Sequence, residues 1–275
     1  MLELPETLAR AKELNMHIRG KIVERVCPPS SPHKFFWHNG EIEKYEENLK
    51  GKRVENTARF GIYVEIEFEG KSKLNFNDGV NVRLLTPGSN PPVKYQLLIE
   101  FTDGFLLVFT VAMYGGIIYH DDNYDNEYYI KSKEVLSPLS DDFNESYFTD
   151  IISLASPKMS VKEFLATKQR IPGLGNGVLQ DILFHAGVHP KRKLVNLEPT
   201  EKIKLYQSIK SVLKAMSDGG GRDTEKDIFG NPGNYKTAMS KNTYKGGCPA
   251  CQGEIVKQAY LGGTVYYCPN CQPSE

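Results

Sequence analysis

The spacing of apolar residues changes twice along the chain. It begins with an approximate helical stripe of Leu4, Leu8, Ala11 and Met16 before Gly20, in which Pro5 suits the first turn. From about residue 21 to residue 119 the apolar residues instead alternate with polar ones or form short runs, as is typical of β-strands. We therefore predict that the first 130 residues form a β-sandwich or barrel with one N-terminal helix.

Turn signals divide this strand region. Glu69-Gly70 and Asp103-Gly104 each separate two apolar runs, and an acidic residue followed by glycine is a good hairpin signal. Residues 86–93 contain two consecutive prolines, which lack the N–H groups that a central strand needs. Residues 121–129 (DDNYDNEYY) are acidic and rich in tyrosine, and we expect them to form an exposed loop.

Beyond residues 137–143 (SPLSDDF) the apolar spacing becomes helical. Ser160 and Glu163 form a capping-box pattern at the start of one helix. Residues 175–187 place four aliphatic side chains on one face of a second helix, which Gly187 ends. Helices are therefore expected to dominate the second half of the chain.

A third helix is predicted over residues 199–216, and the glycines of residues 219–223 (GGGRD) indicate a flexible joint after it. The whole pattern predicts an α+β fold in three parts. These are a β-sandwich with one helix at residues 1–135, a helical domain at residues 136–230 and a β-hairpin domain at residues 231–275.

The bulk composition is that of a globular protein, with 40% hydrophobic and 25% charged residues. No apolar run approaches the roughly 18 residues that suggest a membrane span, and the acidic N-terminus does not resemble a signal peptide. We therefore expect a cytoplasmic protein. The net charge is zero, but residues 151–275 hold 17 Lys and Arg against 10 Asp and Glu, whereas residues 1–150 hold 17 against 24. This asymmetry indicates contact with a polyanion through one half, although chance scatter explains it equally well.

Four of the five cysteines lie near the C-terminus in the pattern CPAC-x16-CPNC, at Cys248, Cys251, Cys268 and Cys271. Paired C-x2-C motifs supply tetrahedral thiolate ligands to zinc. The spacer alternates and turns at Gly262-Gly263, which predicts a β-hairpin that brings the two pairs together. Two disulfides are the competing interpretation, which a cytosolic location disfavours. The pattern predicts one structural Zn²⁺ with no open position for substrate.

The most informative stretch is KQRIPGLGNGVLQDILFHAGVHP at residues 168–190. Gly173 and Gly175 lie in a turn between two helices, and Asn176 stands where the second helix begins. Such a turn offers free N–H groups and the positive end of the helix dipole to a phosphate. By composition alone, a plain tight turn with Asn176 as N-cap is equally reasonable. The flanking basic residues are Lys168, Arg170, Lys191, Arg192 and Lys193.

These features resemble the formamidopyrimidine-DNA glycosylase/endonuclease VIII family. Residues 168–190 are similar to its helix–two-turn–helix signature, and residues 137–143 are similar to its interdomain linker. The cysteine pattern is similar to its zinc hairpin, and residues 3–6 (ELPE) to its opening, so the resemblance covers nearly the whole chain. It implies an N-terminal β-sandwich, a C-terminal helix–two-turn–helix domain with a zinc β-hairpin, and DNA bound in the cleft between them. The residues that it assigns to DNA binding are Lys168, Arg170, Gly173, Gly175 and Asn176.

The resemblance weakens at the family's reactive N-terminus. There a proline in the second position, exposed when methionine is removed, attacks the sugar C1′ through its amine, and the following glutamate moves protons. Here Leu2 replaces the proline, whereas the glutamate is kept as Glu3. A primary amine also forms an imine, so the resemblance makes Leu2 or Met1 the nucleophile, Glu3 the proton shuttle and Glu6 its support. The aminopeptidases that remove an initiator methionine prefer a small second residue, which disfavours removal of Met1 ahead of Leu2. If Met1 is retained, the free amine lies up to about 3.8 Å from its position in the family.

Three further positions depart from the family pattern. The hairpin lysine aligns with Ile62, and the arginine and aromatic residue that fill the gap left by a flipped base align near Met113 and Tyr114. The arginine of the zinc hairpin is replaced by Gly263 and Thr264. These losses suggest altered or absent base excision, with DNA binding retained.

Two main interpretations follow. The first is a base-excision-repair DNA glycosylase/AP lyase with weak or altered excision of oxidised bases. The second is a catalytically inactive reader of damaged or bent DNA, and a third confines the zinc hairpin to protein contacts. The expected partner is double-stranded DNA, damaged or abasic, bound by a monomer that is nucleoid-associated when it holds DNA.

Overall fold

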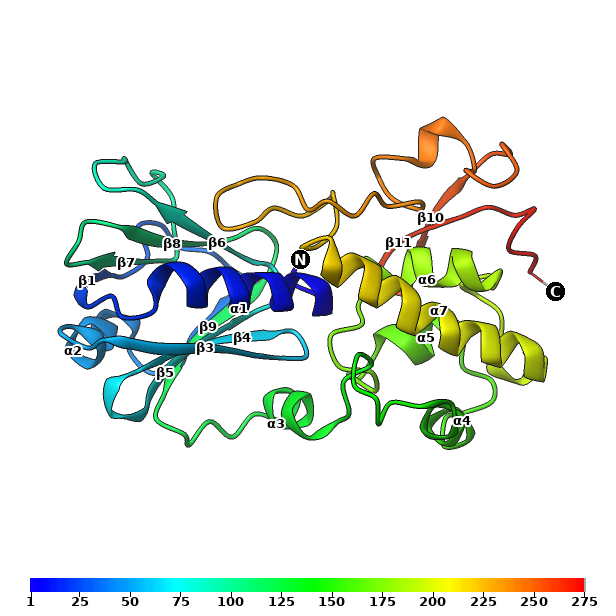
Figure 1. Cartoon of the computed structure of the whole chain (residues 1–275), viewed down its shortest axis with the longest axis horizontal. Helices are drawn as coiled ribbons and strands as arrows, with labels where there is room; N and C mark the ends of the chain where they lie inside the picture. Colours follow the sequence, from blue (N-terminus) through cyan, green and yellow to red (C-terminus); the bar gives the residue numbers. More distant parts are fainter. Residues whose placement is uncertain (275) are drawn as a thin grey trace.

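A β-sandwich and a helical domain lie side by side in the computed structural model, which describes residues 1–274. Helix α1 (Leu4–Ile18) runs along the sandwich, and Figure 1 shows the N-terminus at the junction of the two lobes. The predicted α+β fold, with its N-terminal sandwich and C-terminal helical domain, is confirmed. Among the described residues, no helix combines the length and hydropathy needed to cross a bilayer.

The sandwich consists of two sheets whose apolar faces enclose the first core. One sheet has the strand order β1-β7-β8-β6 and the other β2-β9-β5-β4-β3. Within the described residues, β2 and β9 pair in parallel and the other neighbours are antiparallel. The rings of Phe76 and Phe109 pack edge to face between the sheets, with their centroids 5.3 Å apart. The strands are β1 (Val23–Cys27), β2 (Phe36–Trp37), β3 (Val54–Phe60), β4 (Tyr63–Phe68), β5 (Ser72–Asn77), β6 (Val80–Leu85), β7 (Leu97–Phe101), β8 (Leu106–Val111) and β9 (Gly115–His120).

The first half contains more helix than the sequence predicted. A short helix α2 (Tyr45–Leu49) follows β2, and α3 (Glu127–Glu134) begins inside the segment expected to be an exposed loop. The Asn126 side chain accepts hydrogen bonds from the N–H groups of Tyr128 and Tyr129, which starts α3. Tyr129 is buried against the sandwich, so aromatic packing outweighs the acidic character of this segment. The loop prediction was therefore wrong for residues 127–129.

The helical domain is built from α4 (Glu145–Ser153), α5 (Val161–Ala166), α6 (Val178–Ala186) and α7 (Pro199–Asp218). Ser160 caps α5 by accepting a hydrogen bond from the N–H of Glu163, as the sequence predicted. Gly187 ends α6 with a φ of 69°, a conformation that glycine adopts without steric cost. The second apolar core lies among these helices.

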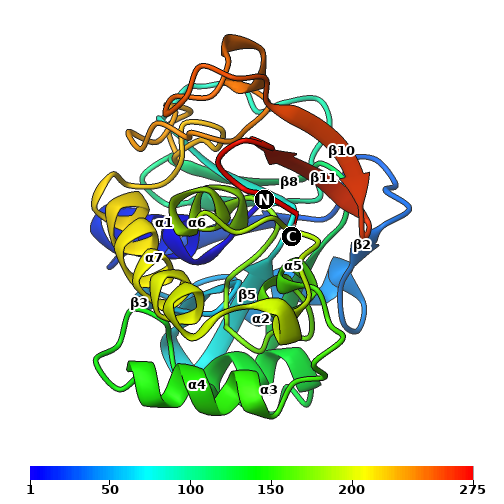
Figure 2. The same cartoon turned by 90° about the vertical axis from the view of Figure 1, so that its right-hand side faces the viewer.

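A two-stranded hairpin of β10 (Val256–Tyr260) and β11 (Gly263–Tyr267) completes the fold. Its turn is Leu261-Gly262, one residue earlier than predicted, because Gly263 already pairs with Tyr260. Both turn residues have positive φ, 47° and 72°, as the tightest hairpin turns require. Figure 2 shows the hairpin above α5.

Candidate functional site

The N-terminus of α6 is occupied by a carboxylate from the sandwich. Glu3 accepts hydrogen bonds from the N–H groups of Gly177, at 2.8 Å, and Val178, at 2.7 Å. The N-cap residue is Gly177 and not Asn176, so the helix is capped from the other lobe. The positive end of the helix dipole thus holds an internal anion, where the sequence suggested a phosphate site.

Arg222 joins this carboxylate to a second one. Glu6 accepts hydrogen bonds from Arg222 through Nε at 3.0 Å, Nη2 at 2.8 Å and the backbone N–H at 3.1 Å. Nη1 of Arg222 lies 3.5 Å from Glu3, and all three side chains are at most 3% exposed. We call Glu3, Glu6 and Arg222 the buried ion cluster. The prediction of a flexible joint at residues 219–223 was wrong, because Arg222 in this segment is hydrogen-bonded to Glu6 of α1.

Two carboxylates share one guanidinium in this cluster, and their pKa values shift in opposite directions from the ordinary value. Burial raises the pKa of Glu3, and the neighbouring Glu6 adds to this, although Arg222 and the α6 amides act against the shift. Burial also opposes ionisation of Glu6, but its hydrogen bonds and ion pair with Arg222 bring its pKa below the ordinary value. The pKa of Arg222 is raised despite its own burial, because both carboxylates favour its charged form.

The glycines of residues 173–177 make room for this junction. A Cβ at Gly175 would lie 2.8 Å from the Glu3 carboxyl carbon, and a Cβ at Gly177 would collide with the Arg222 guanidinium. Gly173 has a φ of 77° and is buried against the sandwich, where its carbonyl accepts the Leu4 N–H at 2.8 Å. These glycines therefore serve the contact between the two lobes.

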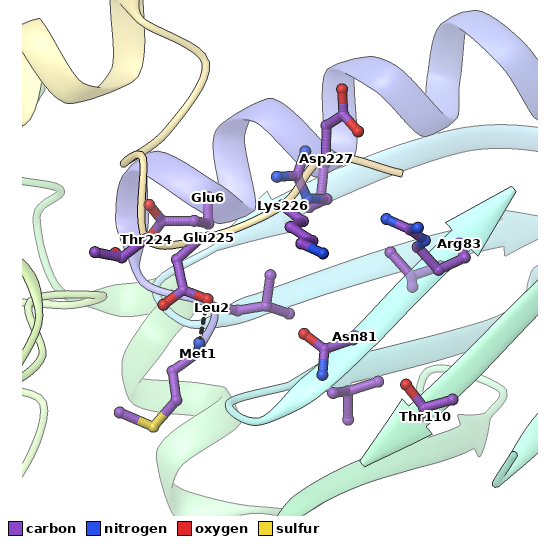
Figure 3. A pocket seen from close by; sticks show the side chains of 13 residues that line it. Met1, Leu2, Glu6, Asn81, Arg83, Thr110, Thr224, Glu225, Lys226 and Asp227 are labelled. Carbon is purple, nitrogen blue, oxygen red and sulfur yellow. Dashed lines mark hydrogen bonds and ion pairs between the residues drawn. The ribbon is translucent and has the colours of Figure 1, made fainter. Parts of the chain in front are cut away.

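The α-amino group of the chain lies beside this cluster. The amino nitrogen of Met1 is 2.6 Å from Oε2 of Glu225, as the dashed line in Figure 3 shows. Leu2 is 6% exposed, packs in the sandwich core and donates its N–H to the Asp78 carbonyl at 2.7 Å. Leu2 therefore anchors the N-terminal segment to the sandwich.

Met1 and Leu2 separate two cavities. The larger, of about 740 Å³, lies between the sandwich, the helical domain and the tip of the β10–β11 hairpin, and we call it the cleft. The smaller, of about 350 Å³, lies between β6 and residues 224–227 and is lined by Glu6 and Arg83 (Figure 3).

Five of the predicted residues line the cleft, whereas four lie elsewhere. Glu6 lines the smaller cavity instead. Lys168 is exposed outside the cleft lining, and Gly173 is buried behind it. Arg170 donates hydrogen bonds to the Thr167 carbonyl and hydroxyl at 3.2 and 3.1 Å, which ties it to the end of α5. The predicted residues that line the cleft are Met1, Leu2, Glu3, Gly175 and Asn176. The positions that depart from the family pattern also line it, namely Ile62, Met113, Tyr114, Gly263 and Thr264.

Asp78 is a cleft residue that the sequence analysis missed. It sits in the turn between β5 and β6 with a φ of 51°, which aspartate tolerates better than most residues. Burial and the nearby Glu3 raise its pKa to about 6, although the Met1 amine opposes the shift. The Asp78-Gly79 turn was the available signal, but it does not reveal that the turn reaches the N-terminus.

Side-chain amides fix the hairpin to α6. Nδ2 of Asn176 and Nε2 of Gln180 both donate to the Thr264 carbonyl at 2.9 Å, and Oε1 of Gln180 accepts the Tyr266 N–H at 3.0 Å. Lys162, a second missed cleft residue, donates to the Tyr260 carbonyl. The wall of the cleft formed by the hairpin is therefore held by α5 and α6.

The four C-terminal cysteines meet at the base of this hairpin. Their sulfur atoms all lie within 4.8 Å of one another, with Cys248–Cys271 at 3.7 Å and Cys251–Cys268 at 3.5 Å. Tetrahedral zinc with Zn–S bonds of about 2.3 Å places its sulfurs about 3.8 Å apart. A disulfide of about 2.05 Å does not fit these separations. The cluster could hold one metal ion.

Comparison with known proteins identifies the family. Residues 1–150 match the formamidopyrimidine-DNA glycosylase N-terminal domain, and residues 135–226 match the H2TH domain of the same enzymes. The chain belongs to the formamidopyrimidine-DNA glycosylase family. This membership confirms the resemblance inferred from the sequence, and the cysteine cluster stands where this family has its zinc finger.

Full-length relatives agree with this assignment. The formamidopyrimidine-DNA glycosylase of Hydrogenovibrio crunogenus is 29% identical over 99% of this chain and 96% of its own length, and that of Neisseria meningitidis is 27% identical over 99% and 100%. In solved structures, the fold is similar to Lactococcus lactis Fpg in complex with abasic-site DNA. The TM-score is 0.83 at 24% identity, over 98% of this chain and 99% of that one.

The buried ion cluster predicts a large loss of stability when Arg222 is replaced. Arg222→Met leaves two buried carboxylates without their partner, so the free energy of unfolding is expected to fall by about 3–5 kcal/mol in urea titrations. The control is Arg25→Met, which removes an exposed pair with Glu100 and is expected to cost less than about 1 kcal/mol. Equal losses in the two variants would contradict the proposed role of the cluster.

The cysteine cluster predicts one zinc ion per chain by elemental analysis. Cys251→Ser is expected to reduce the metal content to near zero, because three thiolates bind the ion much less tightly. Cys27→Ser removes the fifth cysteine, on β1, and is expected to leave the metal content unchanged. Metal-free protein with disulfide-linked cysteines would refute the site.

The raised pKa of Asp78 predicts a pH-dependent stability. Since its folded pKa of about 6 exceeds the ordinary 3.8, the contribution of Asp78 is complete at low pH and is lost as the pH rises through 6. Relative to Asp78→Asn, the wild type should lose about 3 kcal/mol of unfolding free energy between about pH 3 and pH 7. Asp122→Asn is the control. Because Lys73 lowers the pKa of that exposed carboxyl, the contribution of Asp122 to stability should be lost as the pH falls, which is the opposite pH dependence. If the free energy of unfolding has the same pH dependence in the wild type and in Asp78→Asn, the raised pKa of Asp78 is contradicted.

Proposed function

We propose that this protein binds double-stranded DNA at damaged or abasic sites and reacts with the sugar, slowly, through the Met1 amine. The observation that carries the proposal is the position of Met1, which lines the cleft between the sandwich, the helical domain and the hairpin, while its amine pairs with Glu225 at the adjoining smaller cavity. Lactococcus lactis Fpg has been solved with DNA that contains an abasic site and with DNA that contains FAPY-dG. Binding to DNA would bring the protein to the nucleoid.

Phosphate contacts would come from the helical side of the cleft. Asn176 and Gly175 line it, and the exposed Lys168 stands at the same turn. The excess of basic residues in the second half of the chain favours a polyanion on this side. A zinc ion on the four cysteines would supply no reaction chemistry, since four thiolates leave no open position, and would fix the hairpin.

The chemistry available to Met1 is imine formation. Its unprotonated amine would attack the aldehyde C1′ of an opened abasic sugar, a C–N bond would form and the carbonyl oxygen would leave as water. Removal of a proton from C2′ would then break the C3′–O3′ bond and cut the strand. Both steps need a nearby group that accepts and returns protons.

Asp78 suits this proton transfer better than Glu3. Both oxygens of Glu3 accept hydrogen bonds from the start of α6, and Arg222 lies beside them. Asp78 lines the same cleft as Met1, and its pKa of about 6 is close to neutrality, where a general acid–base is most effective. We therefore assign proton transfer to Asp78, and to Glu3 and Glu6 the positioning of the N-terminus.

Excision of oxidised bases is proposed to be weak or altered. Leu2 is held in the core, and Ile62 puts a buried aliphatic side chain where the family pattern has a lysine. Displacement of the nucleophile slows the reaction steeply, because about 1 Å of misplacement can lower the rate about a hundredfold. The second candidate function, a catalytically inactive reader, is favoured by the ion pair that holds the Met1 amine at Glu225.

Borohydride reduction on duplex DNA with one abasic site tests this proposal. We expect a covalent adduct whose DNA-bearing peptide begins with Met1, because only an amine that forms an imine is trapped. Asp78→Asn should lower the trapping rate by about a hundredfold, the usual contribution of a general acid–base. Asp122→Asn, an exposed carboxyl in the loop after β9, should trap at the wild-type rate.

The failures of this test are informative. An adduct on a lysine would show that Met1 is the wrong amine. Normal binding without any adduct would favour the reader, and absence of binding to any duplex at low salt would refute both candidate functions. The intact mass of the purified protein, measured in parallel, establishes which residue carries the free amine.

A further inference from the structure

Three consecutive aromatic residues, Phe35, Phe36 and Trp37, lie at the edge of the five-stranded sheet. Side chains alternate between the two faces of a strand, so Phe36 packs against the sandwich core while its neighbours face outward. Phe35 is 50% exposed and Trp37 is 53% exposed. In the strand β2, Phe36 pairs with Gly115 of β9 and Trp37 pairs with Gly116.

These outward-facing rings belong to a larger surface, which we call the aromatic patch. It surrounds a hollow of about 540 Å³, and its aromatic rings include Trp37 and Tyr114, whose centroids are 6.0 Å apart. Met113 adds a flexible apolar side chain that is 65% exposed. The patch consists of His33, Lys34, Phe35, Trp37, Ala112, Met113 and Tyr114, which include a lysine and no carboxylate.

The aromatic patch is continuous with the cleft. Met113 and Tyr114 line both hollows, and the hydroxyl of Tyr114 lies 3.6 Å from the Met1 sulfur. The Tyr114 carbonyl accepts the Gly79 N–H at 3.1 Å, and a Cβ at Gly79 would collide with that carbonyl. The turn that carries Asp78 therefore fixes the patch to the site.

Exposed aromatic surface of this kind indicates a binding partner with apolar faces. Nucleobases have such faces, and they stack on tryptophan, tyrosine and phenylalanine irrespective of sequence. A lysine beside the rings and the absence of carboxylates in the patch suit the phosphate chain that accompanies the bases. In a fully paired duplex the faces are hidden, so only unpaired bases can reach the patch.

We propose that the aromatic patch binds unpaired bases of a DNA strand whose neighbouring nucleotides lie in the cleft. This inference rests on the proposed DNA binding and adds a preference for DNA with an unpaired stretch beside the damaged site. Stacking on Trp37 and Phe35 holds the unpaired strand, while the helical side of the cleft holds the phosphates of the paired part. The protein thereby discriminates between paired and locally opened DNA.

Trp37 makes the experiment direct, because it is the only tryptophan of the chain. Its fluorescence, excited where tyrosine does not absorb, should be quenched when the metal-loaded protein is titrated with abasic-site duplex that carries an unpaired oligothymidylate stretch beside the site. The same duplex without the unpaired stretch should bind with little quenching. Equal quenching by both DNAs, or none by either, would overturn the inference.

Affinity measured with labelled DNA supplies the second readout. Trp37→Leu and Phe35→Leu should each weaken binding of the partly unpaired DNA about tenfold, the cost of one lost stacking contact, and leave binding of the paired duplex unchanged. The control Phe229→Leu removes a ring of similar exposure, 47%, outside the patch, and should change neither. Unchanged affinity in both patch variants would overturn the inference.

Failure of the inference differs from failure of the proposed function. If the wild type binds neither DNA at low salt, the proposed DNA binding falls and the inference falls with it. If both DNAs bind equally well, only the inference falls. If the Trp37 fluorescence changes with protein concentration in the absence of DNA, the aromatic patch binds a second copy of the chain, and this result would also overturn the inference.

Discussion

The buried pairing of Arg222 with Glu3 and Glu6 is the interaction on which the rest of the site depends. It joins the first turn of α1 to the segment after α7, and through Glu3 it also joins the sandwich to the N-terminus of α6. Removing one partner would leave a buried charge, which is far more costly than breaking a surface pair. The orientation of the two lobes, and with it the shape of the cleft, follows from this cluster.

The same cluster limits the chemistry that the N-terminus can perform. A carboxylate that caps a helix and faces an arginine is held in place, so it positions its neighbours and is poorly suited to exchange protons. The available groups are then Asp78, which lines the cleft, and the amine of Met1, a residue that lines the cleft and pairs through this amine with Glu225. The amine and the proton-transfer group that we propose therefore both differ from those that the family resemblance implied.

The fold and the four-cysteine cluster were predictable from the sequence because their signals are local. Apolar periodicity determines which segments form strands or helices, and C-x2-C spacing determines which sulfurs can meet. The role of Arg222 was not predictable, because its glycine-rich context indicates flexibility and its partners Glu3 and Glu6 are more than 200 residues away. Asp78 and Trp37 were missed for the same reason, since their importance depends on which distant segments the sandwich brings together.

A crystal structure with duplex DNA that carries a stable abasic-site analogue tests the central claim most directly. We predict that the sugar of the analogue enters the cleft, with its C1′ carbon nearest the Met1 nitrogen and Asp78 beside it, while the ion pairs of Arg222 with Glu3 and Glu6 stay intact. A complex with the DNA bound away from the cleft, or with Arg222 released and Glu3 turned toward the sugar, would contradict it.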